Sequence, residues 1–323
     1  IGAMVYGNPD VEYLQLNDDS MWPGSPEWDN PPATRQDLEE VRRLLLSGEI
    51  NAAEDLYVQQ FSRKSITRSH QTLGDLYIRL DHQQVTGYRR DLDLKTGIAS
   101  VSYLHDGFQV TRRILASAPD RAMVMEITTT DPRGLTISMH LSRPADHDQP
   151  TAVSTIEADQ SLHMQGEVTQ LGGKLDNEPM PIDHGVQFDT RVGVWAPGAQ
   201  TEVSADSLIV RNAQKITLYI VNNTSYYGSD FNQRSTRDLK AVLGKSFDVL
   251  AERHVRDYQN YFNRVVLDLG GPDYSNLTTT QRLERVRGGA DDPGLEALLF
   301  HYGRYLLISC SRPGTNPANL QGL

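Results

Sequence analysis

The chain has 323 residues, of which 38% are hydrophobic and 23% charged, and its net charge is −11. This length favours two domains, and the composition is typical of a globular protein with a sizeable core. A duplex nucleic acid is an unfavourable partner for such an acidic chain, because phosphate binding needs clustered Lys and Arg. No apolar run approaches the roughly 20 residues that span a bilayer. We therefore expect no nucleic-acid and no membrane partner, whereas a neutral sugar is compatible with this surface.

Both ends of the chain look internal to a longer sequence. The first residues, IGAMVYGN, form an apolar run without an initiator Met or a signal sequence. The last residues, CSRPGTNPANLQGL, pass through a turn-rich stretch into a new apolar run. We therefore expect a fragment of a longer protein, whose compartment the sequence does not give. Cys310 is the single cysteine, so no internal disulfide can form, and its run LLISC predicts a buried hydrophobic role rather than a nucleophile.

The first 33 residues predict a β-hairpin followed by a loop. Met4–Tyr6 and Tyr13–Leu16 are apolar, and the intervening Gly-Asn-Pro-Asp is strong turn chemistry. The stretch WPGSPEWDNPPAT then predicts a loop from its Pro and Gly content.

Two helices are predicted within 34–62. Thr34 is a suitable N-cap, with Asp37 three residues later. Apolar residues at helical spacing follow on one face: Leu38, Val41, Leu44 and Leu45. Gly48 ends this helix, and a second apolar pattern continues to Phe61.

From about Leu73 the hydrophobic period changes to two. The alternating segments are 76–80, 99–104, 109–117, 122–128, 135–141, 186–195 and 215–221. Many short strands with this spacing predict a large antiparallel sandwich. The predicted fold class is therefore mainly β with α.

From about Asp230 the pattern returns to helix. An amphipathic stretch covers 245–265, a short strand is predicted at 265–271, and two further helices are predicted to about Arg287 and from about Leu295 to Ser309. We therefore divide the chain into a β-sandwich domain at 1–230, with the helical insertion 34–62, a helical linker at 231–290, and the start of another domain at 291–323.

Common catalytic motifs are missing from the sequence. It contains no Walker-type phosphate loop, HExxH, CxxC or GxSxG, and its nine histidines show no metal-ligand spacing. Asp18 and Asp19 could form a carboxylate pair for glycosidic bond cleavage. Adjacent residues on an extended segment point to opposite faces, however, so a role in fixing the loop is the preferred interpretation.

The loop after the first hairpin has side chains that suit a sugar. Aromatic faces pack on sugar C–H groups, while Asn and Asp bind hydroxyls. Trp22 is preferred to Trp28 as a ligand contact because it follows the polar NDDS, and Asn17 lies beside it. The alternative is that the tryptophans only pack the loop on the sandwich. The same packing role is preferred for His70-Gln71.

The terminal stretch RPGTNPANLQG places four hydrogen-bonding side chains on one loop: Arg312, Thr315, Asn319 and Gln321. Loops that follow rigid helices often carry binding sites. We therefore expect Thr315, Asn319 and Gln321 to bind substrate together with Asn17 and Trp22. The alternative is a loop-capping role without a ligand.

These stretches resemble glycoside hydrolase family 95, the inverting α-L-fucosidases and related α-L-galactosidases. Bacterial members open with LGAMVFG…IQLNEDTLWSGGP, which is similar to IGAMVYGNPDVEYLQLNDDSMWPGSP here. The strands of the family's N-terminal β-domain are similar to LGDLYIRL, YRRDLDLKTGIASVSY and FQVTRRILASAPDRAMVMEI. Its linker and first barrel helix are similar to YFNRVVLDLG and to RLERVRGGADDPGLEALLFHYGRYLLISCSRPGTNPANLQGL. The departures are small: Asn316 stands where Leu is usual, and His301 where Gln is common.

The resemblance implies an N-terminal β-super-sandwich, a helical linker and, at 291–323, the first helix of an (α/α)6 catalytic barrel. In the family a Glu acts as general acid, and an Asp helped by Asn residues acts as base. All of these lie in the barrel, beyond Leu323. The resemblance therefore implies no catalytic residue in this chain, which we expect to be inactive alone.

The function implied by the resemblance is exo-acting hydrolysis that releases terminal α-linked L-fucose from fucosylated oligosaccharides or glycans, without a metal or an organic cofactor. An α-L-galactosidase is an alternative, since L-galactose is L-fucose with a C6 hydroxyl. A second alternative is a carbohydrate-binding sandwich without catalysis, and a third is a scaffold that only shapes the barrel's pocket.

Overall fold

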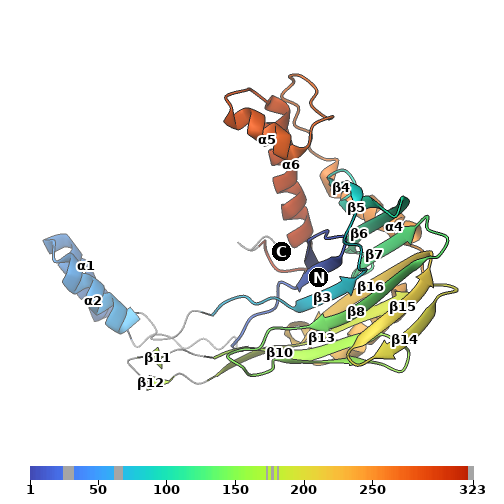
Figure 1. Cartoon of the computed structure of the whole chain (residues 1–323). Coiled ribbons are helices and arrows are strands. Elements are labelled where there is room, and N and C mark those ends of the chain that lie inside the picture. The colour runs from blue at the N-terminus through green and yellow to red at the C-terminus, as the bar shows by residue number, and fades with distance from the viewer. Residues whose placement is uncertain (25–32, 62–67, 172–173, 176–177, 180–181, 319–323) are drawn as a thin grey trace.

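Two antiparallel sheets pack face to face in the computed structural model, which describes residues 1–24, 33–61, 68–171, 174–175, 178–179 and 182–318 (Figure 1). The strand order is β1-β2-β3-β8-β15-β14 in the first sheet and β4-β5-β6-β7-β16-β13-β10-β9 in the second. Helices follow the sandwich toward the C-terminus. The predicted fold class, mainly β with a sandwich followed by helices, is confirmed.

The strands of the first sheet are β1 (Gly2–Val5), β2 (Val11–Asn17), β3 (Gly74–Arg79), β8 (Leu135–Ser142), β14 (Gln200–Ser204) and β15 (Ser207–Ala213). Those of the second are β4 (Thr86–Asp93), β5 (Ile98–His105), β6 (Phe108–Ser117), β7 (Ala122–Thr129), β9 (Ala152–Ile156), β10 (Leu162–Gln170), β13 (Asp183–Trp195) and β16 (Lys215–Thr224). A small separate ladder joins β11 (Lys174–Leu175) and β12 (Glu178–Pro179). The described helices are α1 (Arg35–Ser47), α2 (Ile50–Phe61), α3 (Phe231–Val242), α4 (Phe247–Phe262), α5 (Thr279–Arg287) and α6 (Pro293–Cys310).

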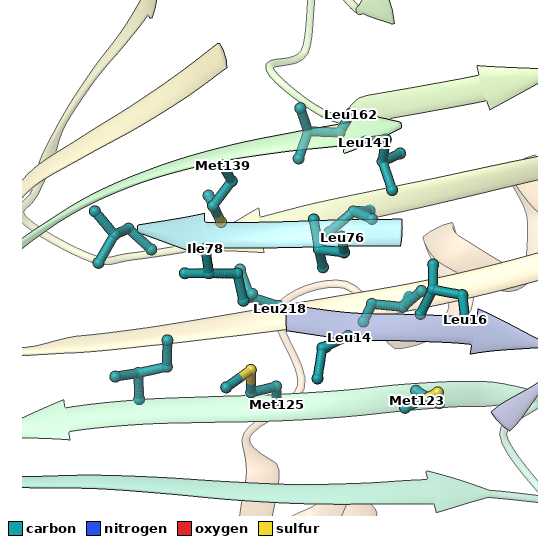
Figure 2. Close-up of a cluster of buried hydrophobic side chains, with 14 of the residues drawn as sticks. Leu14, Leu16, Leu76, Ile78, Met123, Met125, Met139, Leu141, Leu162 and Leu218 are labelled. Atoms are coloured by element: carbon teal, nitrogen blue, oxygen red, sulfur yellow. The ribbon is translucent and has the colours of Figure 1, made fainter. Parts of the chain in front are cut away.

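The main core lies between the two sheets. Leu14 of β2 and Leu76 of β3 are fully buried and come from the first sheet, while Met125 of β7 and Leu218 of β16 come from the second. Figure 2 shows these side chains filling the space between the sheets. Every second residue of a strand points to this core, as the period of two predicts.

The outer face of the second sheet is also buried, because α3 and α4 cover it. Val124 and Tyr219 point outward from the central strands and pack with Leu239 of α3 and Phe247 of α4. The central strands β7 and β16 are therefore buried on both faces. This explains their nearly continuous apolar sequences, AMVMEI and ITLYIV.

A buried ion pair fixes the β1–β2 turn inside the sandwich. Arg112 Nη1 lies 2.7 Å from Glu12 Oε2, and both side chains are fully buried. The guanidinium also donates to the backbone oxygens of Asn8 and Pro9, at 2.8 and 3.0 Å, and to the Tyr103 hydroxyl. These partners compensate the desolvation of two charges.

The helical insertion forms as predicted. The Thr34 hydroxyl accepts a hydrogen bond from Asp37 N, and the Asp37 carboxylate accepts one from Thr34 N at 2.7 Å, which completes a capping box. Gly48 ends α1 with a φ of 83°, a left-handed conformation that favours glycine. The α1–α2 hairpin projects away from the two sheets (Figure 1).

Two local predictions are wrong. Residues 265–271 form no strand, because no sheet edge receives them; instead His301 of α6 bonds the backbone of Leu267, and Arg304 donates to Val265 O at 2.8 Å. Cys310 is partly exposed instead of buried, since it lies in the last turn of α6, where the described residues leave much of the helix uncovered.

Candidate functional site

The candidate site begins where β2 ends and the chain turns. Asp18 Oδ1 accepts hydrogen bonds from the backbone N of Ser20 at 3.1 Å and from its hydroxyl at 2.6 Å. Asp18 Oδ2 accepts one from Asn222 Nδ2 of β16 at 2.9 Å. The amide of Asn222 is oriented by Thr190, whose hydroxyl donates to Asn222 Oδ1 at 3.0 Å. The turn is therefore fixed to the end of the second sheet.

The carboxyl groups of Asp18 and Asp19 lie together. Burial raises the pKa of Asp19, and the nearby charge of Asp18 raises it further. Burial also raises the pKa of Asp18, whereas the hydrogen bonds from Ser20 and Asn222 lower it. The expectation of opposite faces is thus wrong, because the chain turns at Asp19 and no longer follows strand geometry.

Trp22 lies beside this pair and is 37% exposed. Its Nε1 donates to Asp19 O at 3.1 Å, and its ring meets His70 edge-on at 5.4 Å. His70 Nε2 lies 2.9 Å from Asp18 O. Close packing of the Trp22 backbone against β13 requires Gly185, because a Cβ there would collide with Trp22 O. Trp22 is thus anchored through its backbone while part of its ring stays accessible.

Two tyrosines line the other side of the pair. Tyr226 and Tyr227 form a short 3-10 turn (Ser225–Tyr227) after β16, are about half exposed, and meet edge-to-face at 4.8 Å. Burial and the charges of Asp19 and Asp18 raise the pKa of Tyr227 to about 12. The Tyr227 hydroxyl is therefore a neutral donor near two carboxyl groups.

The loop after α6 reaches the same place. Tyr226 OH donates to Asn316 Oδ1 at 3.3 Å, and the Asn316 side chain lies near enough to Asp19 to lower the pKa of that carboxyl group. The base of the loop is held by Arg312, which pairs with Asp257 of α4 at 2.9 Å and lies over the Tyr261 ring. Segments of the chain some 300 residues apart thus meet at Asp19.

The five residues predicted to bind substrate fall in different environments. Asn17 is 8% exposed and accepts a hydrogen bond from Asp18 N, so it fixes the turn. Thr315 bonds within its own loop, to Arg312 N and Arg312 O at 2.9 Å each. Trp22 is accessible at the Asp18–Asp19 pair. Asn319 and Gln321 lie outside the described residues, as does Trp28.

Tyr226 and Tyr227 are not among the site residues predicted from the sequence. The segment NNTSYYGSD could have indicated them, because two aromatic residues follow a buried strand directly and precede a glycine. What could not be read from the sequence is that this strand end lies beside the end of β2.

The resulting surface, defined here as the Asp19 cluster, contains Asp18, Asp19, Trp22, Tyr226, Tyr227 and Asn316. It combines carboxyl, amide and hydroxyl groups with accessible aromatic rings, and this combination suits recognition of sugar hydroxyls and C–H faces. Across the part of the chain that the structure describes, no group of three or more His, Cys, Asp or Glu residues is arranged to hold a metal ion. None of the described helices is long and apolar enough to cross a bilayer.

Two family models match the chain. Residues 1–229 match the model described as "Glycosyl hydrolase family 65, N-terminal domain". Residues 246–323 match "Glycosyl hydrolase family 95 catalytic domain". The second match includes α4, α5, α6 and the loop that carries Asn316.

Curated relatives align over the whole chain. "Alpha-L-fucosidase 2" of Arabidopsis thaliana is 32% identical over 351 residues, covering 100% of this chain and 41% of that protein. "Probable alpha-fucosidase A" of Aspergillus niger is 28% identical, with the same coverage of both proteins. The chain therefore spans about two fifths of the length of these relatives. These relatives come from a plant and a fungus, and a bacterial origin of this chain, which its resemblance to bacterial family members implies, stays a prediction.

Among solved structures, a "putative kojibiose phosphorylase from human microbiome" superimposes with a TM-score of 0.43 and 14% identity, covering 62% of this chain and 29% of that one. A likeness of this degree carries no argument about function.

Proposed function

The chain belongs to the family described as "Glycosyl hydrolase family 65, N-terminal domain" through residues 1–229 and matches the family-95 catalytic domain over 246–323, and on this basis we propose that it is part of an exo-acting, inverting hydrolase of family 95 that releases terminal α-linked L-fucose. The names of the plant and fungal relatives support this activity. The observation that carries the proposal for this chain is the Asp19 cluster, in which sandwich and family-95 residues meet through Asn316.

The proposed substrate is a fucosylated oligosaccharide or glycan. In this proposal the Asp19 cluster forms one wall of the pocket that binds it. Trp22 offers a partly exposed ring for a sugar C–H face, and Asp19 and Asn316 offer hydrogen-bonding groups beside it. In this proposal Asn17 shapes the turn that carries Asp19, and Thr315 shapes the loop that carries Asn316. Asn319 and Gln321 follow Asn316 closely in the sequence, and we keep them as proposed substrate contacts.

The catalytic acid and base are proposed to lie outside this chain. Inversion needs two carboxyl groups about 6.5–9.5 Å apart, with a water molecule between one of them and the sugar. Asp18 and Asp19 are neighbours in one turn, and the Asp18 carboxylate is already bonded by Ser20 and Asn222, so we do not propose them as this pair. We therefore assign both to binding and keep the proposed division into a sandwich at 1–230, a linker at 231–290 and the first part of the catalytic barrel at 291–323.

Side-by-side rates on aryl α-L-fucoside and aryl α-L-galactoside test the substrate. The full-length protein is expected to cleave the fucoside faster, because the exposed rings of the Asp19 cluster favour contact with a methyl group over contact with a hydroxyl. Faster cleavage of the galactoside would favour the α-L-galactosidase alternative. Cleavage of neither, together with measurable binding of fucosylated glycans, would favour the non-catalytic binding alternative.

A further inference from the structure

The hairpin formed by α1 and α2 has a small core of its own. Val41, Leu44 and Ala53 are buried between the two helices, and Leu56 and Phe61 pack against them. Among the described residues, this cluster includes no side chain of the sandwich. Two helices of 13 and 12 residues with so small a core are marginally stable in water. We therefore expect the hairpin to pack against a further partner.

Each helix of the hairpin carries an exposed apolar stripe beside its buried residues. On α1, Leu38 and Leu45 are seven residues apart, which places them on one side of the helix. On α2, Ile50 and Tyr57 have the same spacing, and the Tyr57 ring stacks on Phe61 at 5.4 Å. The side chains of the two spaced pairs are all exposed.

The two stripes lie on the same side of the hairpin. At about 100° per residue, each stripe is roughly a quarter turn from the buried residues of its helix, in the same rotational sense. Only Gly48 and Glu49 join α1 to α2, so the helices run antiparallel, and this sense brings both stripes to one face. We define this surface as the hairpin face, which consists of Leu38, Leu45, Ile50, Tyr57 and Phe61.

The other face of the hairpin is polar. Arg43 Nη2 lies 2.7 Å from Glu40 Oε1 on α1, and Asp55 and Gln59 lie on the same side of α2. An amphipathic element of this kind presents its polar face to solvent and its apolar face to protein. The hairpin face is therefore a candidate docking surface.

The position of the hairpin indicates which partner can reach it. The hairpin is inserted between β2 and β3, and both of its connections start at the Asp19 cluster, where Trp22 meets His70. The loop after α6 reaches the same cluster, since Asn316 accepts a hydrogen bond from Tyr226. The last described residues therefore lie beside the base of the hairpin.

Helix α6 leaves a second apolar surface uncovered. Leu299, Phe300 and Leu307 are exposed in the part of the chain that matches a catalytic domain. The plant relative aligns over 100% of this chain, hairpin included, yet the chain covers only 41% of that protein. A domain that begins with α6 and continues beyond Leu323 could cover both surfaces. A second copy bound through the hairpin face would leave those of α6 exposed.

We propose that the hairpin face is a docking surface for the part of the full-length protein that follows Leu323. The hairpin then holds the catalytic domain against the sandwich on the side opposite α6 (Figure 1). This inference rests on the proposed function, in which the chain is the first part of a longer hydrolase.

Hydrogen–deuterium exchange and thermal unfolding of the full-length protein and of the 323-residue chain test this proposal. Amides of 38–61 are expected to exchange about tenfold more slowly in the full-length protein. Leu45→Glu should lower its melting temperature by about 3 °C or more, and that of the chain by less than about 1 °C, because Leu45 is exposed in the chain. Leu46→Glu is the matched control, since Leu46 is 90% exposed and lies about 100° around the helix, outside the hairpin face.

Equal exchange of 38–61 in the two proteins would overturn the proposal, as would equal effects of Leu45→Glu and Leu46→Glu on the full-length protein. A dimer of the chain that Leu45→Glu dissociates, measured by sedimentation velocity, would assign the hairpin face to a second copy and also overturn it. None of these measurements depends on fucose release. A full-length protein that cleaves no fucoside would therefore refute the proposed function and leave this test intact.

Discussion

Tyr226 donates a hydrogen bond to Asn316 across 90 positions of sequence, at 3.3 Å between the phenolic oxygen and the amide oxygen. Tyr226 follows the last strand of the sandwich, whereas Asn316 follows the helix α6. The same Asn316 side chain lowers the pKa of Asp19, which follows the end of β2. One asparagine thereby joins the two parts of the chain that match different family models.

Removing this contact should loosen the loop at 312–318. A double-mutant cycle with Tyr226→Phe and Asn316→Leu is expected to give a coupling energy of about 0.5 kcal/mol, because the bond is solvent-exposed and neutral. Urea unfolding of the four proteins measures it. A coupling energy indistinguishable from zero would show that the two segments are not joined in solution.

Asp18→Asn and Asp19→Asn should have opposite effects on stability at neutral pH. The pKa of Asp19 is raised by burial and by Asp18, so its ionised form costs stability above that pKa, and Asp19→Asn is expected to stabilise the chain at pH 7. Asp18 is an ionised acceptor for Ser20 and Asn222, so Asp18→Asn should cost about 1–3 kcal/mol.

Melting temperatures at pH 7 and below pH 3.8 separate these effects. Below that ordinary Asp pKa the Asp19 carboxyl group, whose pKa is raised, is protonated, so the benefit of Asp19→Asn should disappear. The pKa of Asp18 is lowered, so Asp18 keeps its charge to a lower pH than Asp19 does. An equal loss of stability in both variants at pH 7 would contradict the assignment of different roles.

Replacing Glu12 by Gln should strongly destabilise the chain. It would leave the fully buried Arg112 guanidinium without its counter-ion, at a cost of about 3–5 kcal/mol. Glu39→Gln is the control, since its ion pair with Arg35 on α1 is exposed and should contribute less than about 0.5 kcal/mol. Urea denaturation of both variants measures the difference, and similar midpoints would refute the role given to the buried pair.

His163 should make stability depend on pH in the neutral range. The hydrogen bond to Asp189 raises the pKa of His163 above 6.5, against the opposing effect of burial. A raised folded-state pKa contributes stability that is complete below 6.5 and is lost as pH rises through the folded-state value. His163→Gln should therefore flatten the curve of unfolding free energy against pH above 6.5.

NMR titration of His163 provides the direct check. Its pKa should lie above the ordinary histidine value of 6.5. A value for His163 below 6.5 would reverse the predicted slope.

The sequence predicts elements whose signals are local. The Thr34–Asp37 capping box and the alternation in β7 need only neighbouring residues, and both are confirmed. The run 265–271 has a strand-like pattern but no partner strand, so its apolar residues alone could not decide its structure. The proximity of Asp19 to Asn316 depends on the packing of α6 against α4, which no local pattern contains.

The Trp22→Ala variant distinguishes a sandwich that contacts the sugar from a sandwich that only shapes the barrel's pocket. If the Trp22 ring contacts the sugar, KM of the full-length enzyme should rise about tenfold with little change in melting temperature, because the ring is partly exposed. A lower melting temperature with unchanged KM would instead support the scaffold alternative.

The most direct test of the central claim is release of L-fucose from 2′-fucosyllactose, measured in parallel for the full-length protein and for the 323-residue chain. We predict that the full-length protein releases free L-fucose with inverted anomeric configuration and that the 323-residue chain alone releases none. A full-length protein that leaves 2′-fucosyllactose and the aryl fucoside intact, or a chain that cleaves them without the remaining domain, would contradict it.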